Sequence, residues 1–210
     1  MKHKLHLLLL PFISTALLIG LSACGGTSMT LGNAGKNLGG TRFYSLNSLA
    51  LSSPPAPSNS NSKKRIGIGP LSIPRLLNRP QIITRKNNTE IDMAEMHQWG
   101  GSYKEELMQV MVDNLAALLK TENIEEYPWK FSFKPHYQVR IDIDRFDGQI
   151  GKNVVLKARW RLLNNNKELL VKRAFITTPV SGNSYNHYVK AQSQTLAVFS
   201  RKIADEINKL

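Results

Sequence analysis

The chain is 210 residues long, and its 28 Lys and Arg residues against 15 Asp and Glu residues give a formal net charge of +13 at pH 7. This balance favours anionic partners, although an excess of charge is also a common way to keep a surface solvated. The single cysteine excludes a disulfide within the chain, so the stability of the fold has to come from its hydrophobic core.

The N-terminus has the three regions of a secretory signal peptide. Lys2 and Lys4 precede an almost wholly apolar stretch, residues 7–21, which ends at the small residues Ser22 and Ala23. This stretch is shorter than the roughly 20 apolar residues that a membrane-spanning helix needs. The sequence therefore predicts that residues 1–23 are a signal peptide that is removed.

Cys24 stands directly behind this signal. The string Leu21-Ser22-Ala23-Cys24 resembles the bacterial lipobox, in which the cysteine thiol receives diacylglycerol, the signal is cut before it, and the new amine is acylated. Two or more acyl chains hold a protein stably on a membrane. Gly25 stands where an aspartate would retain a lipoprotein at the inner membrane under the enterobacterial rule, so the expected location is the periplasmic face of the outer membrane. This compartment excludes nucleic acid as a partner.

Two polar stretches follow the cysteine. Residues 24–40 are rich in Gly, Ser, Thr and Asn, which predicts a lipidated flexible tether. A short strand is expected at residues 42–46, and the Ser-, Pro- and Asn-rich residues 51–62 predict a surface loop after it. Residues 41–210 are expected to form a single domain.

The next elements are a strand, a hairpin and a helix. Residues 66–73 predict a strand that Pro74 ends, because proline has no N–H to donate to a neighbouring strand. Residues 81–85 and 90–94 flank a polar turn and predict a hairpin. Ser102 and Glu105 have the spacing of a capping box, which indicates a helix from there to about Lys120.

The second half of the domain predicts a three-stranded meander and a closing helix. Apolar and polar residues alternate in residues 137–143 and 154–162, which is the period of a half-buried strand, and residues 169–176 form a third strand. Apolar residues then recur at helical spacing from about Ser184 to Leu210. The predicted fold class is α+β, with a largely antiparallel sheet and two helices packed on one of its faces.

The tightest acidic group is Asp142, Asp144 and Asp147, which could hold a metal or act in acid–base catalysis. The following strand carries basic side chains on its polar face, so cross-strand ion pairing is the favoured interpretation. These basic residues are Lys157, Arg159 and Arg161. The histidines that remain after removal of the signal lack the spacing of metal ligands.

The string Gly67-Ile68-Gly69-Pro70 resembles a phosphate-binding loop only weakly. It lacks a third glycine, and it has a proline where a backbone N–H donor is needed. A bulge within a strand is the favoured interpretation. We therefore predict no catalytic residue, no cofactor and no metal site, and an enzyme is the least favoured class of function.

A protein without a catalytic site acts by binding other molecules, and the segment between Pro74 and Gln81 is a candidate binding surface. Pro74 and Pro80 restrict the backbone around Leu76, Leu77 and Arg79, and Gln81 follows. The segment is hypothesised to bind a partner or a second copy of the chain, because a rigid segment loses little entropy on binding and arginine is frequent at binding hot spots. In the alternative interpretation the two leucines only cap the core.

The three tryptophans differ in their expected roles. Trp160 alternates with apolar neighbours and is expected in the core. Trp99 and Trp129 lie in predicted connections, and for them a core position and a role as interface anchors both stay open.

Several strings together resemble the PqiC/YmbA family of ABC-type transport auxiliary lipoproteins. They cover most of the chain after Cys24, and the Arg-Pro-Gln order is fairly specific. Asn78 departs from the aspartate common at its position, and 100–102 departs from a more acidic stretch, which puts charge contacts at those two places in doubt. The matching strings are Tyr44-Ser45-Leu46, Ile66-Gly67-Ile68-Gly69-Pro70-Leu71-Ser72-Ile73-Pro74, Leu77-Asn78-Arg79-Pro80-Gln81-Ile82-Ile83-Thr84-Arg85, Trp99, Asn114-Leu115, Tyr127-Pro128-Trp129 and Tyr137-Gln138-Val139-Arg140-Ile141-Asp142-Ile143.

The resemblance implies a noncatalytic outer-membrane subunit without a cofactor. Its implied partners are a periplasm-spanning MCE-family protein and an inner-membrane transport subunit, with which it moves lipids between membranes and preserves the envelope. A homo-oligomer is also possible. The alternative is a lipid-anchored cofactor of another envelope machine, such as an activator of a peptidoglycan synthase or a secretion accessory.

Overall fold

The computed structural model describes residues 40–51 and 64–210. The predicted signal peptide, Cys24, the tether up to residue 39 and residues 52–63 of the predicted surface loop lie outside the described residues. Gly39–Leu210 forms one compact unit of the chain. Its elements are β1 (Arg42–Tyr44), η1 (Leu49–Leu51), β2 (Ile66–Ser72), β3 (Gln81–Arg85), β4 (Ile91–Trp99), α1 (Tyr103–Leu119), β5 (Ile124–Glu126), β6 (Tyr137–Gly148), β7 (Asn153–Asn164), β8 (Lys167–Pro179) and α2 (Tyr185–Asn208).

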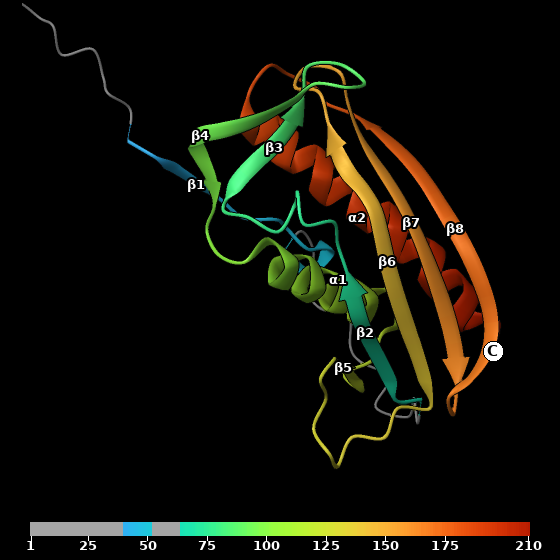
Figure 1. Cartoon of the computed structure of the whole chain (residues 1–210). Helices are drawn as coiled ribbons and strands as arrows, with labels where there is room; N and C mark the ends of the chain where they lie inside the picture. The colour runs from blue at the N-terminus through green and yellow to red at the C-terminus, as the bar shows by residue number, and fades with distance from the viewer. Residues whose placement is uncertain (1–39, 52–63) are drawn as a thin grey trace, which may run out of the picture. The chain divides into compact units, whose positions relative to one another are not determined.

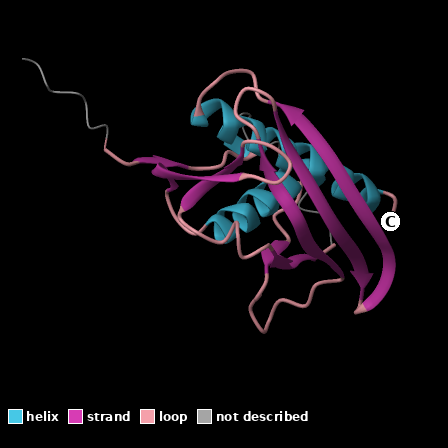
Figure 2. Cartoon of the chain, turned by 45° about the horizontal axis from the view of Figure 1, so that its top comes forward, coloured by secondary structure: helices cyan, strands magenta, loops and turns pink. Residues whose placement is uncertain are grey.

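The fold is α+β, as predicted, but its strands form two sheets. The larger sheet has five strands in the order β5-β2-β6-β7-β8, and the smaller one has three in the order β1-β4-β3. The long pairings of β6 with β7 and of β7 with β8 are antiparallel, whereas β2 runs parallel to both β5 and β6, and β1 runs parallel to β4. Figures 1 and 2 show both helices on the same side of the larger sheet.

The alternating patterns place their apolar residues toward the helices. Val139, Ile141 and Trp160 are at most 2% exposed, so the core position predicted for Trp160 is confirmed. α1 begins at the predicted cap, where the hydroxyl of Ser102 accepts a hydrogen bond from the backbone N–H of Glu105. It ends at Lys120, which has the left-handed conformation that terminates many helices.

The glycine-rich string of β2 forms the predicted bulge. The pairing of β2 with β6 shifts register between Ile68 and Leu71, and Gly69 has a φ of 114°. The carbonyl of Gly69 accepts a hydrogen bond of 2.9 Å from the side-chain amide of Gln138, which holds the bulge in place. An added Cβ at Gly69 would lie 2.8 Å from the Cβ of Tyr127 and 3.0 Å from the terminal carbon of Met108.

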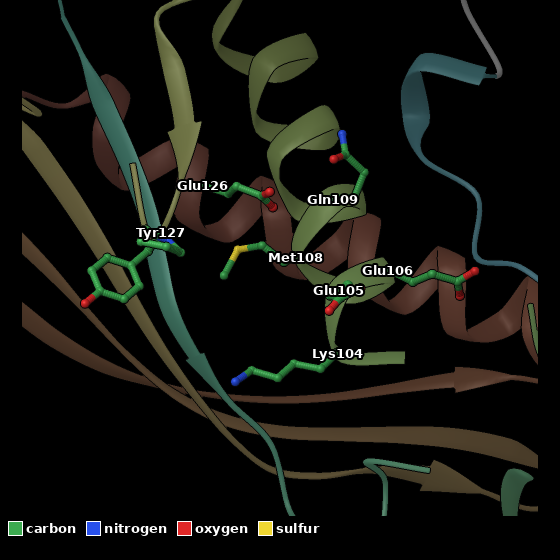
Figure 3. Close-up of a pocket in the computed structure, with 8 residues that line it drawn as sticks. Lys104, Glu105, Glu106, Met108, Gln109, Glu126 and Tyr127 are labelled. Carbon is green, nitrogen blue, oxygen red and sulfur yellow. The ribbon is translucent and has the colours of Figure 1, made fainter. Parts of the chain in front are cut away.

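Met108 and Tyr127 also line a hollow of about 590 Å³ beside the first half of α1. Figure 3 shows the side chains of Lys104, Glu105 and Glu126 around it. The bulge in β2 therefore helps to shape one wall of this hollow.

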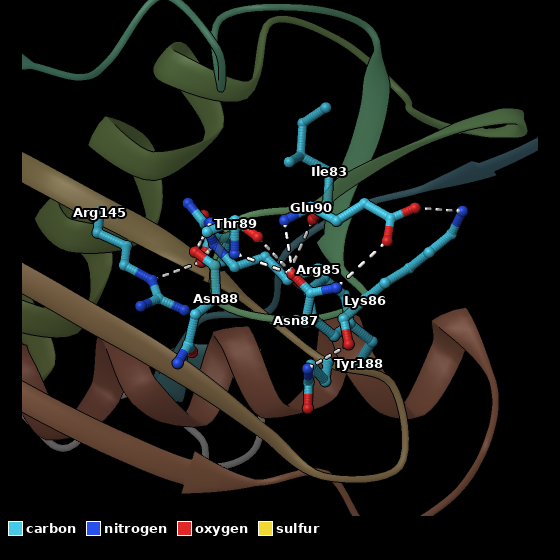
Figure 4. A network of polar contacts seen from close by, with 11 residues as sticks. Ile83, Arg85, Lys86, Asn87, Asn88, Thr89, Glu90, Arg145 and Tyr188 are labelled. Carbon is cyan, nitrogen blue, oxygen red and sulfur yellow. Dashed lines mark hydrogen bonds and ion pairs between the residues drawn. The ribbon is translucent and has the colours of Figure 1, made fainter.

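A buried carboxylate joins the two sheets. Asp147 lies on the part of β6 that extends beyond the end of its pairing with β2 at Asp142. Its Oδ1 accepts hydrogen bonds from the Nε atoms of Arg85 in β3, at 2.8 Å, and of Arg145 in β6, at 2.6 Å. The side chain of Asp147 is only 3% exposed. Figure 4 shows Arg85 and Arg145 in this network together with the β3–β4 turn.

The other two aspartates behave differently from Asp147. Asp142 pairs with the cross-strand Arg161 at 3.9 Å, which agrees with the predicted ion pairing. Residues two apart in a regular strand lie on the same face, but a bulge in β6 between Ile143 and Arg145 interrupts this pattern at Asp144. Arg145 occupies the position opposite Lys157, and Asp144 is exposed at the irregularity.

We expect Gly69→Ala to lower the free energy of unfolding by about 1–3 kcal/mol, because the alanine would combine an unfavourable backbone conformation with close contacts to Met108 and Tyr127. Gly101→Ala is the control, since no atom lies within 4 Å of an added Cβ there. Urea unfolding of both variants measures the difference, and equal losses would contradict the bulge argument.

We expect Asp147→Asn to cost about 2–3 kcal/mol of stability, because it leaves two partly exposed arginines without their shared carboxylate. Asp142→Asn should cost less than about 1 kcal/mol, since its ion pair is long and about half exposed. Thermal and chemical unfolding of the two matched variants checks this ranking. A larger loss for Asp142→Asn would show that the outer ion pair matters more.

Candidate docking surface

The proline-bracketed segment between β2 and β3 consists of successive tight turns. The N–H of Leu77 donates to the carbonyl of Pro74 at 2.9 Å, and the N–H of Asn78 donates to the carbonyl of Arg75 at 3.2 Å. Leu77 is 4% exposed and belongs to the core, and Leu76 is partly buried against it. Leu77 therefore caps the core, which was the alternative interpretation of this segment. Burying a leucine side chain stabilises a fold by about 1.5–3 kcal/mol.

The end of the segment is fixed to β4. The carbonyl of Pro80 accepts a hydrogen bond of 2.8 Å from the backbone N–H of Trp99. The guanidinium Nη1 of Arg79 donates to the sulfur of Met93 at 2.7 Å. Arg79 is half-buried and Met93 is 52% exposed, so the two side chains share one edge of the surface.

The neighbouring strands of the small sheet carry further exposed apolar side chains. Phe43 on β1 and Gln81 on β3 both lie opposite Gln98 of β4, one on each side, and Phe43 is 66% exposed. Ile91 and Met96 of β4 are also exposed. We call this set the Phe43–Arg79 surface: Phe43, Arg79, Pro80, Gln81, Ile91, Met93 and Met96. Arg79, Pro80 and Gln81 stand together in the sequence, whereas the other four residues were not predicted. Phe43 and Gln81 share the partner Gln98, and the Arg79 contact brings Met93 to the segment, while Ile91 lies opposite Arg85 at the hairpin end of the same strand.

The opposite face of the small sheet is held by aromatic side chains. The hydroxyl of Tyr44 and Nδ1 of His97 are 2.7 Å apart, and the His97 ring stacks on Tyr185 at the start of α2 with centroids 3.9 Å apart. Burial lowers the pKa of His97, with a smaller contribution from the charge of Arg42, and this favours the neutral ring. These contacts make the small sheet a fixed support for the Phe43–Arg79 surface.

The structure separates the two undecided tryptophans. Trp99 is 4% exposed and stacks on Tyr103 with ring centroids 4.3 Å apart, so its side chain is part of the core. Trp129 is half-buried, meets the ring of Tyr127 edge-on, and packs over Gly67 of β2. Trp129 therefore belongs to the connection around the larger sheet and not to the Phe43–Arg79 surface.

The hollow beside α1 offers polar contacts of mixed charge. It combines Lys104 with the carboxylates of Glu105, Glu106 and Glu126. Burial raises the pKa of Glu106, while hydrogen bonds from Ser45 and Leu46 act in the opposite direction. The residues that line the hollow include no cysteine, serine or histidine.

The structure describes residues 40–51 and 64–210, and the two statements that follow hold for these residues. Neither of the two long helices there is apolar enough over a sufficient length to span a membrane. The same residues contain no group of three or more His, Cys, Asp or Glu side chains arranged to hold a metal ion.

Solved structures share this fold. A crystal structure of an uncharacterised protein matches with a TM-score of 0.66 at 16% sequence identity, over 80% of this chain and 99% of the other. Protein XCC0632 from Xanthomonas campestris, of the DUF330 family, matches with a TM-score of 0.58 at 16% identity, over 79% of this chain and 90% of its own.

Comparison with curated proteins gives no match. A model of the ABC-type transport auxiliary lipoprotein component, in contrast, matches residues 44–204. That range begins in β1 and ends within α2, so it contains both sheets and nearly all of the structure described above. The chain belongs to the family of ABC-type transport auxiliary lipoproteins.

Proposed function

We propose that this lipoprotein is a noncatalytic outer-membrane subunit of an MCE-type system for lipid transport between membranes. In this proposal it docks a periplasm-spanning MCE-family protein, which in turn works with an inner-membrane transport subunit, and so supports envelope integrity. The observation that carries the proposal is the exposed Phe43–Arg79 surface on a fixed sheet of a transport auxiliary lipoprotein.

The composition of this surface suits protein binding. Aromatic residues, methionine and arginine are enriched at the centres of protein interfaces. Phe43 and Met93 are more than half exposed, which leaves apolar area available for burial by a partner. Both strands that carry them are already ordered by their pairing in the small sheet, so binding requires little further loss of backbone entropy.

The position of this surface also suits a subunit attached by its N-terminus. Phe43 lies in β1, the first strand of the domain, and we propose that acyl chains on Cys24 hold the membrane end of residues 24–40. A flexible tether of this length extends over a few nanometres at most, on the order of 5–6 Å times the square root of its residue number. The domain would then meet its partner close to the membrane.

We expect Arg79→Glu and Phe43→Ser each to reduce capture of the MCE partner at least tenfold in a pull-down of the intact complex. Loss of an interface hot spot costs about 2 kcal/mol or more, which corresponds to such a change in affinity. Phe131→Ser is the matched control, because Phe131 is 98% exposed and lies outside the Phe43–Arg79 surface.

Thermal melting of each variant separates binding from folding. Phe43→Ser should melt close to the unchanged protein, because the ring is largely exposed. If Arg79→Glu and Phe43→Ser capture the partner normally, the surface does not bind it. Loss of self-association with partner capture intact would instead assign the surface to a second copy of the chain.

The anchor gives a separate prediction. Cys24→Ser should leave uncleaved precursor at the inner membrane, because the thiol is the proposed acylation site. A secreted form that begins at Asn33 behind a cleavable signal should be found in the soluble periplasmic fraction. Membrane fractionation measures both, and sedimentation of the secreted form with membranes would show a second attachment.

A further inference from the structure

The face of the larger sheet that points away from the helices carries a regular array of basic side chains. Strand register places nine side chains there in three rows across β6, β7 and β8. Residues between these rows, such as Ile141 and Trp160, point to the core and are buried. We call the array the basic grid, and its rows are Arg140, Arg161 and Val171, then Asp142, Arg159 and Arg173, then Arg145, Lys157 and Phe175.

The grid contains six cations and one carboxylate. That carboxylate, Asp142, lies 3.9 Å from Arg161, which is a weak ion pair, and Glu168 lies at the same distance from Arg161. Asp144 is exposed beside the grid, and Asp147 is already shared by Arg85 and Arg145. The six cations of the grid therefore outnumber these four carboxylates of the described residues.

Two exposed apolar side chains stand among these cations. Phe175 is 66% exposed and Val171 is 42% exposed. The ammonium of Lys157 lies 5.4 Å from the centre of the Phe175 ring, so the ring and the charge face the same solvent region. Attraction to anionic lipids by Lys and Arg, together with burial of apolar side chains, is what holds a protein surface on a bilayer.

We propose that the basic grid rests on the anionic phospholipid headgroups of the membrane that anchors this lipoprotein. Arginine binds phosphate oxygens through two parallel hydrogen bonds, and basic residues near an anionic membrane each add to the attraction. Figure 1 shows β6, β7 and β8 curving past α2, and among the described residues no helix or strand lies over their opposite face. A second sheet carries the Phe43–Arg79 surface, so the proposed contact with lipid leaves that surface free and stands independently of the proposed partner.

The test places photoreactive benzoylphenylalanine at position 175 of the intact acylated protein, reconstituted in vesicles of phosphatidylethanolamine and phosphatidylglycerol. We expect phospholipid adducts at this position. Combined Arg159→Gln and Arg173→Gln should reduce the adduct yield at least tenfold, because each cation near an anionic membrane contributes about fivefold. Melting temperatures confirm that the variants fold. Lys190→Gln with Arg201→Gln, two exposed cations of α2, is the control for charge and should leave the yield unchanged.

Benzoylphenylalanine at position 131 is the control for exposure, since Phe131 is almost fully exposed and lies off the grid. Equal lipid adducts at positions 131 and 175, or equal yields in vesicles of phosphatidylcholine alone, would overturn the proposal. Benzoylphenylalanine at position 175 in intact cells tests whether the grid binds a protein instead of lipid. Adducts of position 175 with a protein, without lipid adducts, would assign the grid to an acidic protein surface.

Discussion

The carboxylate of Asp147 determines how the two sheets of this protein are joined. It lies on the end of β6 that β2 leaves unpaired, and it binds Arg145 of its own strand and Arg85 of β3. A buried carboxylate is tolerated only when its charge is compensated, and here Arg85 supplies part of that compensation from β3, which ties β3 to β6. The hydroxyl of Tyr188 in α2 donates a hydrogen bond to the carbonyl of Ile83, which connects β3 to the helix layer. Together with the aromatic contacts of Tyr44, His97 and Tyr185, these bonds hold the small sheet in its position.

This arrangement gives the domain two exposed surfaces of different chemistry. The small sheet presents Phe43, Met93 and Arg79, a mainly apolar set with a single cation. The larger sheet presents the basic grid, in which cations predominate. Because the surfaces belong to different sheets, a protein and a membrane can be contacted at the same time without competing for the same side chains. Six of the 28 basic residues thus lie together on one face of the larger sheet.

Features encoded by neighbouring residues were predictable from the sequence, and features set by distant contacts were not. The Ser102 cap and the alternation around Trp160 are local signals, and both elements were found as predicted. β5 has only three residues, and its pairing with β2 provides the evidence for a strand that its own sequence lacks. Two prolines indicated that the segment before β3 is constrained, but they carry no information on direction, so the burial of Leu77 was not predictable.

The parallel pairing of β2 has a consequence for the order of folding. Ile66 has its partners at Ile124 and Tyr137, so the centre of the larger sheet cannot form until the chain beyond residue 137 is available. Contacts between residues so far apart in sequence give a high contact order, and such topologies fold slowly compared with those built from local contacts. A chain that is exported from its N-terminus therefore emerges with β2 unpaired until β5 and β6 have followed it. Its apolar residues would need protection until the second half of the domain arrives.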